Sequence, residues 1–520
     1  MIDKFIAALL PSIEHFHLLG HSIKEALEHN SHMQRLIRRY PRSIRSLANR
    51  VNRSQFNGLP LTVLCLAFTY VLALFAGIVE DIVTSDSIVS VDHAAAQLIA
   101  SFRAPSVLPL LVWITSLGEP LIVGALLLVM SLLLWLLNRK YAIVGLLVSC
   151  LGASLFTTLG KLAFQRPRPI EAVLIESSYS FPSGHATGSV AFYGFMGYLL
   201  IRSTDRWKTR VNVFFAAGGL VLLIGLSRIV LGVHYLSDVW AGYLVGALWL
   251  IIGIIVTEWL SANDRIDWNT VIEQRQKVAV FCLLAIASIG VTGYASTRTL
   301  PVIISRPETI IQIKKQFVAL LHGDKLSRTA TLLGEPEQPL AFAIVAQSTD
   351  ALITTLNQAG WVAADKPNPQ NILRLIKDGL DYETAPIAPA FWNDQINDLA
   401  FEKPERHTRD TALATVRIWK TLFRIGQDSI FVGVARQYDG IRWGIIHTVS
   451  PDVDAAAEQF VKSLGLFGKP SAACQQSLIS PTIGTFLMGD QFFTRGHLWL
   501  LDLRDTPNIT PLCESESAKQ

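Results

Sequence analysis

Three short polar clusters interrupt an otherwise apolar part of the chain: residues 161–169 read Lys-Leu-Ala-Phe-Gln-Arg-Pro-Arg-Pro, residues 181–185 read Phe-Pro-Ser-Gly-His, and residues 227–238 read Ser-Arg-Ile-Val-Leu-Gly-Val-His-Tyr-Leu-Ser-Asp. Each cluster lies beside a long apolar run. Charged side chains at membrane depth or at the membrane rim are energetically costly, so they indicate a functional site by default. We therefore expect the three clusters to meet in space and to form one site.

The composition indicates a membrane protein. Of the 520 residues, 51% are hydrophobic and 17% are charged, whereas a soluble chain carries roughly 25% charged residues. The length allows two or three domains. Seven arginines lie between Arg35 and Arg53 with no acidic residue among them. Such a run is compatible with nucleic-acid binding, but an apolar run follows directly, which favours the cytoplasmic flank of a first membrane span and predicts no nucleic-acid partner.

Seven apolar runs come near the roughly 20 residues that cross a bilayer as a helix. They are residues 60–79, 120–137, 141–160, 187–202, 212–231, 239–257 and 277–295. Segment 104–117 is also apolar, but its length and the prolines Pro105 and Pro109 predict an interfacial or re-entrant piece. An additional span at this segment is the alternative, and it would invert the orientation of everything downstream.

Loop charges predict how the spans are oriented. Three basic loops fall on one face, which the positive-inside rule makes the cytoplasm: residues 35–53, 138–140 and 202–210. The opposite face receives residues 80–118, 161–186 and 231–238. All three polar clusters therefore emerge on the extracytoplasmic side. The basic residues Lys161, Arg166 and Arg168 lie on the wrong side for the positive-inside rule, which favours a specific role for them.

The last predicted span places the C-terminal region outside the cytoplasm. Residues 299–515 read as a soluble α+β domain of about 200 residues, large enough to bury its own core. The expected strands are 341–346, 415–419, 430–436 and 485–493, and the expected helices are 349–359 and 453–464. Cys474 and Cys513 lie in this region, where an oxidising compartment allows either a disulfide or two free thiols. The other three cysteines fall in apolar runs, and no metal-type spacing is present.

The clusters hold what the cleavage of a phosphate monoester requires: positive charge and N–H donors around the phosphate oxygens, an in-line nucleophile, and an acid for the leaving oxygen. Three cations are available: Lys161, Arg168 and Arg228. Arginine suits bidentate contact with phosphate, and lysine acts as a point charge. Ser183 is expected to cap the helix that follows it, where the N–H groups of Gly184 and His185 can point at an anion.

Two histidines can divide the duties of nucleophile and acid. His234 and Asp238 are four residues apart, which on a helix puts them on one face. The carboxylate then fixes the tautomer and leaves the other ring nitrogen free to attack phosphorus. Gly232 is expected to end the preceding helix, so that Arg228 and His234 both turn inward. A lone histidine at a membrane rim is more often interfacial than catalytic, but the second histidine, His185, the Ser-Gly pair and the carboxylate together favour catalysis.

Four neighbouring side chains have simpler interpretations. Arg166, next to Pro167, is either a solvated loop charge or part of the site. Ser227 is expected to hydrogen-bond within its helix. Glu119 is expected to be a solvated residue at a span end, and Tyr235 to be an interfacial aromatic residue.

These residues resemble the signature of the type 2 phosphatidic acid phosphatase superfamily: Lys, six residues, Arg-Pro; then Pro-Ser-Gly-His; then Ser-Arg, five residues, His, three residues, Asp. All three elements match in order and spacing, and the spacing selects Arg168 over Arg166. The resemblance implies that His234 is a nucleophile that forms a phosphohistidine, that His185 protonates the leaving group, and that Asp238 orients the nucleophile. It also implies the phosphate-binding residues: Lys161, Arg168, Ser183, Gly184 and Arg228. It further implies six core spans, a site on the outer face and no metal.

The C-terminal region resembles the domain that follows such phosphatase domains in LssY-type bacterial membrane proteins. The likeness rests on residues 391–395, 417–419 and 431–435, which read Phe-Trp-Asn-Asp-Gln, Arg-Ile-Trp and Phe-Val-Gly-Val-Ala. It implies no mechanism for this region.

The sequence thus predicts an all-α polytopic membrane bundle, a six-helix phosphatase core plus one extra span, followed by a soluble α+β domain. The expected parts are a cytoplasmic helical segment 1–57, a membrane phosphatase domain 58–260, a linker with the seventh span 261–298, and an extracytoplasmic domain 299–520. We expect a multi-pass protein of a bacterial inner membrane.

The expected activity is metal-independent and cofactor-free hydrolysis of a lipid phosphate or diphosphate, such as phosphatidic acid, phosphatidylglycerophosphate or polyprenyl diphosphate. A lipid phosphotransferase that uses the same phosphohistidine is an alternative. A non-enzymatic envelope-binding protein with a lipid-sensing membrane part is another. Vanadate haloperoxidases share the pocket type, but seven apparent spans argue against one. The lipid and the oligomeric state stay open.

Overall fold

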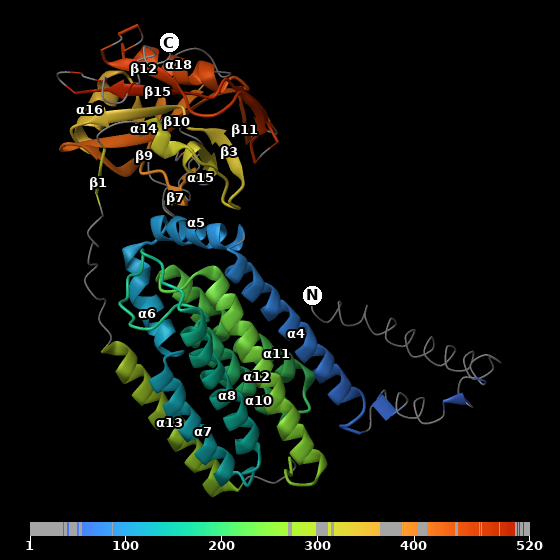
Figure 1. Cartoon of the computed structure of the whole chain (residues 1–520). Coiled ribbons are helices and arrows are strands. Elements are labelled where there is room, and N and C mark those ends of the chain that lie inside the picture. Colours follow the sequence, from blue (N-terminus) through green and yellow to red (C-terminus); the bar gives the residue numbers. More distant parts are fainter. Residues whose placement is uncertain are drawn as a thin grey trace.

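The computed structural model describes residues 55–85, 87–268, 273–297, 310–313, 317–364, 389–403, 413–442, 446–466 and most of 468–513, with a few isolated positions elsewhere. Figure 1 shows a bundle of helices and, beyond one of its ends, a domain rich in strands. The predicted segment 1–57 lies almost wholly outside the described residues and stays a prediction.

Apolar helices build the bundle. In chain order they are α4 (Leu59–Thr84), α5 (Ser87–Ser101), η1 (Pro105–Val107), α6 (Leu108–Ser116), α7 (Pro120–Leu136), α8 (Ala142–Phe164), α9 (Gly184–Ser189), the π-helical η2 (Val190–Gly194), α10 (Phe195–Arg202), α11 (Trp207–Val230), α12 (Leu236–Ala262) and α13 (Gln274–Ser296). Within the described residues, α4, α8, α11, α12 and α13 are each long and apolar enough to cross a membrane. Helix α7 has 17 residues, and the predicted fourth span is divided by η2. The helical bundle with several apolar helices is therefore confirmed, whereas its insertion in a membrane and its seven spans stay predictions.

The connection between the first two predicted spans contains α5, a helix that the sequence reading missed. Helix α5 and the following η1–α6 segment are together long and apolar enough to cross a membrane, but they are bent by 95° relative to each other. Such a pair is either a broken span or a re-entrant loop. The structure thus keeps both interpretations of segment 104–117 open.

Helix α12 is the most buried of the long apolar helices and lies at the centre of the bundle. It packs against α8 and against η2, which continues α9, through glycines that allow the backbones to approach. A Cβ atom on Gly246 would stand 2.6 Å from Cβ of Val190, and one on Gly253 would stand 2.6 Å from the carbonyl oxygen of Gly145. Small residues permit such close packing between helices in membranes.

Two of the loops predicted to be cytoplasmic, 138–140 and 202–210, meet at one end of the bundle together with the segment after α12. The Arg139 guanidinium donates to Oγ of Ser203 at 2.9 Å and to the carbonyl of Trp268 at 3.0 Å. Arg139 and Arg202 both lie over the Trp268 ring, 5.2 Å from its centre. The three polar clusters lie at the other end, so the predicted grouping is confirmed for loops 138–140 and 202–210, while loop 35–53 lies almost wholly outside the described residues. The side of the membrane that each end faces stays a prediction.

A mixed sheet organises the C-terminal domain. Among the described residues it has nine strands, with the order β12-β15-β4-β10-β9-β8-β5, while β1 pairs with β9 and β11 with β10. The strands are β1 (Ile311–Gln312), β4 (Phe342–Ala346), β5 (Val362–Ala363), β8 (Leu399–Lys403), β9 (Leu413–Ile425), β10 (Asp428–Arg442), β11 (Ile446–Val449), β12 (Ala473–Ser477) and β15 (His497–Asp502). A short second sheet contains β2 (Arg328–Ala330), β3 (Pro336–Pro339), β6 (Phe391–Trp392) and β7 (Gln395–Ile396).

Both faces of the large sheet are covered, which explains why β4 is apolar without alternation. Helices α16 (Thr349–Gln358) and α18 (Val453–Ser463) pack on the face that carries Phe342 and Ile344. Helix α14 (Phe317–Leu321) packs on the face that carries Ala343 and Val345. Both helices expected in this domain are present, and three of the expected strands correspond to β4, β9 and β10.

The fourth expected strand, 485–493, is wrong. The chain instead forms a hairpin of β13 (Thr482–Thr485) and β14 (Gln491–Thr494). Gly489, at a φ of +89°, reverses the chain between them, and a glycine adopts this left-handed conformation without strain.

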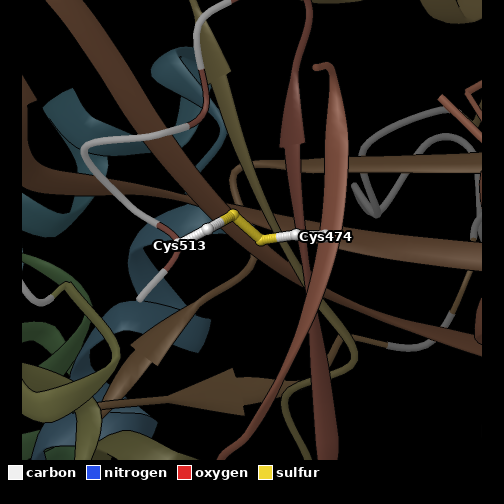
Figure 2. The surroundings of a disulfide bond; sticks show 2 residues. All are labelled: Cys474 and Cys513. Atoms are coloured by element: carbon white, nitrogen blue, oxygen red, sulfur yellow. A yellow bond between two sulfur atoms is a disulfide. The ribbon is translucent and has the colours of Figure 1, made fainter. Parts of the chain in front are cut away.

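A disulfide joins Cys474 of β12 to Cys513, with 6.5 Å between their Cα atoms (Figure 2). The sequence left a disulfide and two free thiols open, because it could not place the two Cα atoms within bonding range. The bond ties the segment after β15 to a strand at the edge of the sheet.

Candidate active site

The loop after α8 lies over one end of the bundle and carries the first cluster. Helix α8 ends at Phe164, and Gln165 adopts a left-handed conformation with its N–H bonded to the carbonyl of Lys161 at 3.1 Å. The Lys161 ammonium donates to Oγ of Ser178 at 3.2 Å and to the carbonyl of Tyr179. The last turn of the helix is thereby fastened to the far side of the loop.

The third cluster is shaped by the end of α11. Gly232 has a φ of +70°, and the N–H of Val233 bonds back to the carbonyl of Arg228 at 3.1 Å. This is how a left-handed residue ends a helix, as the sequence predicted. A Cβ atom on Gly232 would stand 2.7 Å from both Nη2 of Arg103 and the carbonyl oxygen of Glu171, so the site accepts no larger residue without a shift.

Two arginines of the clusters converge on one carboxylate, Glu176. Nη2 of Arg168 lies 2.8 Å from Oε2 of Glu176, and the Arg228 guanidinium pairs with Oε1. Arg228 is 1% exposed and also donates to Oγ1 of Thr115 at 2.9 Å. The two carboxylate oxygens occupy positions that suit the oxygens of a phosphate group. The sequence reading missed Glu176, because an acidic residue in a polar loop gives no local signal.

The charge of Glu176 is stabilised strongly by these partners. Burial alone would raise the pKa of this carboxyl, but the charges of Arg228 and Arg168 lower it to about 2. Glu176 is therefore ionised at every physiological pH.

His234 is buried beside the arginines. Its Nε2 lies 3.2 Å from Nη1 of Arg168, which also donates to the carbonyl of Val233 at 2.6 Å. Its Nδ1 lies 3.5 Å from Oδ2 of Asp238, longer than a hydrogen bond. Burial, followed by the charges of Arg228 and Arg168, lowers the pKa of His234 well below its usual value. The imidazole is thus neutral and has a nitrogen lone pair.

His234 and Asp238 lie close together, but not because they share one face of a helix, as the sequence predicted. Helix α12 begins at Leu236 with Tyr235 as its N-cap, so His234 lies outside the helix. Asp238 is the third residue of the helix, and its Oδ2 accepts the N–H of Tyr235 at 2.9 Å. The carboxylate therefore points back towards the preceding loop, where the histidine lies.

Arg166 is not a solvated loop charge. It is 9% exposed, and its Nη1 donates to Oδ1 of Asp238 and to Oγ of Ser237, both at 2.8 Å. Its Nη2 donates to Oδ2 of Asp92, on α5, at 2.8 Å. The guanidinium also lies 4.4 Å from the centre of the Tyr235 ring. Tyr235 is 3% exposed, so its predicted interfacial role is wrong.

The second cluster lies at the start of α9. Ser183 occupies the N-cap position, but its side chain makes no capping bond, which corrects the predicted capping role. Its backbone N–H donates to the carbonyl of Asp238 at 3.0 Å. The Oγ atom is buried and has no partner among the described residues. Because the N–H groups of Gly184 and His185 open the helix, they have no acceptor within it and are suited to bind an anion.

His185 reaches the site beside the turn between α6 and α7. A Cβ atom on Gly118 would stand 3.3 Å from both Cβ and Cδ2 of His185 and 2.7 Å from Cγ2 of Ile224. The missing side chain at Gly118 thus leaves room for the imidazole.

Two further predictions about single residues have different outcomes. Ser227 donates to the carbonyl of Ile224 within its own helix at 2.5 Å, as expected. Glu119 accepts a hydrogen bond from Tyr294 of α13 at 2.9 Å, so it is a contact between helices and not merely a solvated residue. In the part of the chain that the structure describes, no three His, Cys, Asp or Glu side chains gather as a metal site would require. The metal-independent mechanism stays a prediction.

Comparison with known families assigns two segments of the chain to a family each. The PAP2 superfamily matches residues 142–262, which include every predicted site residue. The family described as LssY C-terminus matches residues 322–498. The chain contains a PAP2 superfamily domain and an LssY C-terminal domain.

Individual relatives are phosphatases by name. Phosphatidylglycerophosphatase B of Bacillus subtilis (strain 168) is 29% identical over 181 residues, which are 34% of this chain and 88% of the relative. Lipid phosphate phosphatase delta of Arabidopsis thaliana is 30% identical over 105 residues, 20% of this chain and 23% of the relative. The match thus spans less than a quarter of the plant protein.

Two solved structures are also similar. The first transmembrane PAP2 type phosphatidylglycerolphosphate phosphatase from Bacillus subtilis is 28% identical, with a TM-score of 0.33, and the match covers 38% of this chain and 96% of that one. Aquifex aeolicus LpxE is 25% identical, with a TM-score of 0.24, and the match covers 31% of this chain and 92% of that one.

Proposed function

We propose that this chain is a membrane phosphatase that hydrolyses a lipid phosphate or diphosphate through a phosphohistidine on His234. The observation that carries the proposal is the pairing of Glu176 with Arg168 and Arg228 beside this buried, neutral histidine. A site that holds a carboxylate between two arginines can hold the oxygens of a phosphate in the same way. The phosphatase names of the relatives support a hydrolase.

In the proposed reaction the substrate phosphate replaces the Glu176 carboxylate between Arg168 and Arg228. Nε2 of His234 forms a bond to phosphorus while the bond from phosphorus to the lipid oxygen breaks. His185, which is protonated once the negative phosphate is bound, gives that oxygen its proton. Water then attacks phosphorus, His185 accepts a proton from it, and the nitrogen–phosphorus bond breaks to release inorganic phosphate. Asp238 stabilises the positive charge that the ring carries in the intermediate.

The remaining cluster residues bind the phosphate in this proposal. Lys161 contributes a point charge, and Ser183 offers its buried hydroxyl. The N–H of Gly184 approaches the anion closely, because no side chain lies in the way.

We further propose that the site and the C-terminal domain face the extracytoplasmic side of a bacterial inner membrane. The basic loops at the opposite end support this orientation by the positive-inside rule. The disulfide between Cys474 and Cys513 supports it as well, because disulfides persist in oxidising compartments. The proposed division is a membrane phosphatase domain at 58–260, a linker and last span at 261–298, and the distal domain at 299–520.

A phosphate-release assay on the purified full chain tests the proposal. The panel contains phosphatidic acid, phosphatidylglycerophosphate and polyprenyl diphosphate, each with and without a lipid alcohol as acceptor and with and without a chelator. We expect release of phosphate from at least one lipid, insensitive to the chelator, and loss of turnover in His234→Ala. His322→Ala, at an exposed histidine of the distal domain, serves as the matched control and should keep full activity.

Two results would contradict the proposal. Phosphate transfer to the acceptor with little free phosphate would make the chain a phosphotransferase. Full turnover in His234→Ala would remove the assigned nucleophile.

A further inference from the structure

We propose that Asp92 and Arg166 are positioning residues, which act through Asp238 to orient His234 and to balance its charge. This inference rests on the proposed function, since it assumes that His234 reacts. It concerns a helix, α5, that lies outside the matched phosphatase family segment.

Arg166 connects two carboxylates that come from distant parts of the chain. One terminal nitrogen of its guanidinium donates to Asp92 and the other to Asp238, at 2.8 Å each. All three side chains are buried, with exposed fractions of 1%, 9% and 0% for Asp92, Arg166 and Asp238. An arginine whose planar fork is held at both ends has little freedom to rotate. The orientation of Asp238 is therefore fixed from α5.

Ser237 closes the arrangement. Its backbone N–H donates to Oδ1 of Asp92 at 3.0 Å, and its hydroxyl donates to Oδ2 of the same carboxylate. Asp92 thus binds both Arg166 and the first turn of α12, the turn that carries Asp238. Two independent paths join α5 to the carboxylate that faces His234.

Charge gives Asp92 a second role. Arg166 and Asp238 alone would form a neutral pair, which has no net negative charge to stabilise a positively charged imidazolium ring. With Asp92 the group carries one net negative charge, which matches the positive charge that His234 acquires when it bonds to phosphorus. Because the group is buried, this complementarity is screened weakly. Asp92 therefore favours the reacting state of His234 and not the binding of the substrate.

Substitution of Asp92 or Arg166 is expected to lower kcat with little change in KM. In Asp92→Asn and in Arg166→Gln, kcat per active site should fall about 10- to 100-fold, as it does when outer-shell partners are lost elsewhere. KM should stay within about twofold, since neither residue touches the substrate phosphate. Arg166→Lys, which keeps the charge but not the fork, should give an intermediate kcat. The kcat of the double variant Asp92→Asn/Arg166→Gln should be no lower than that of the less active single variant, because the two residues act as one unit.

The concentration of active sites is measured from the burst of product that accompanies formation of the phosphoenzyme. Dividing the rate by this concentration gives a kcat that misfolded protein does not affect. Glu80→Gln on α4 and Arg202→Gln at the opposite end of the bundle are the control variants, and both should behave as the parent. A purely structural role of Asp92 and Arg166 would lower the burst and leave kcat per active site unchanged, which would overturn the inference. Arg166→Lys carries the same test if either neutral variant fails to fold.

His234→Ala separates this inference from the proposed function. If that variant keeps its turnover, the proposed function fails, and the inference fails with it. If His234→Ala is inactive while Asp92→Asn and Arg166→Gln keep kcat per active site within twofold of the parent, only the inference fails.

Discussion

Glu176 shows at the scale of one residue how the free site is neutralised. Lys161, Arg168 and Arg228 bring three positive charges to one end of the bundle, and the carboxylate offsets part of this charge while no phosphate is bound. Since the pKa of Glu176 is lowered to about 2, its pairing is complete above the usual pKa of a glutamate and is lost only as the pH falls towards 2. In the proposed reaction, a substrate between pH 5 and 8 therefore displaces an ionised carboxylate.

Glu176→Gln is therefore expected to bind inorganic phosphate more tightly than the parent does. A neutral amide makes weaker hydrogen bonds to arginine than a carboxylate, so the inhibition constant should fall about 3- to 10-fold. The measurement is product inhibition by phosphate at pH 5 and pH 8, and the gain should be the same at both. Glu171→Gln, in the same loop, is the control. A weaker inhibition in Glu176→Gln would show that the carboxylate helps to bind phosphate and does not compete with it.

Signature spacing predicts most of the site at the residue scale, because Lys161, Arg168 and His234 are recognisable from their neighbours in sequence. Asp92 and Glu176 are not recognisable in this way. Asp92 lies 74 residues from Arg166, and Glu176 lies 52 residues from Arg228, although Arg168 is close to it in the sequence. Only the folded chain brings these distant partners together. Arg166 was set aside because the signature spacing selects Arg168, yet both arginines lie in the cluster, Arg166 on Asp238 and Arg168 at Nε2 of His234.

Among the elements, the ends of α8, α11 and α12 position the candidate site residues. The middle parts of these helices do not. The apolar runs predicted these helices well, since burial in lipid requires a long apolar segment. They predicted the ends poorly. His234 was expected on a helix with Asp238, but the helix begins two residues after His234, and the capping position of Tyr235 determines where the carboxylate points.

Gly232→Ala tests the importance of the end of α11. A non-glycine residue at a φ of +70° is strained, which costs of the order of 1–3 kcal/mol, and the new Cβ would meet Arg103 and the Glu171 carbonyl. We expect a lower Tm and at least a tenfold loss of turnover, because His234 moves with this turn. Gly219→Ala, at a position of α11 with no atom within 4 Å of the added Cβ, should change neither. Unchanged turnover in Gly232→Ala would contradict the account of this turn.

At the scale of the whole molecule, α5 is shared between the two halves of the chain. Oε1 of Gln97 accepts the backbone N–H of Ile396, in the β6–β7 hairpin, at 2.8 Å. A Cβ atom on Gly334 would stand 3.0 Å from Cβ of Ser90. Ser90 and Gln97 share one side of the helix, and Asp92 lies on the opposite side at 3.6 residues per turn. The distal domain thus lies against α5, the helix that carries Asp92 and that lies between this domain and the rest of the bundle (Figure 1).

Gln97→Ala should loosen this contact selectively. The amide of Ile396 loses its acceptor, so its hydrogen exchange in the full chain should accelerate about 5- to 10-fold, the equivalent of roughly 1 kcal/mol for one hydrogen bond. The amides of Val432 and Trp419 in the central strands should exchange as in the parent. Equal protection of Ile396 in both proteins would show that the two halves do not meet through α5 in solution. The sequence could not predict this contact, because 299 residues separate its partners.

Trapping the covalent intermediate tests directly whether His234 is the nucleophile. Purified full-length protein is mixed with a radiolabelled lipid phosphate, quenched within one turnover under alkaline conditions that preserve phosphohistidine, and digested for mass spectrometry. We expect phosphate on His234 in the parent, none in His234→Ala, and a slower appearance of the label in Asp92→Asn. A label on another residue, or turnover of the same lipid in His234→Ala, would contradict this assignment.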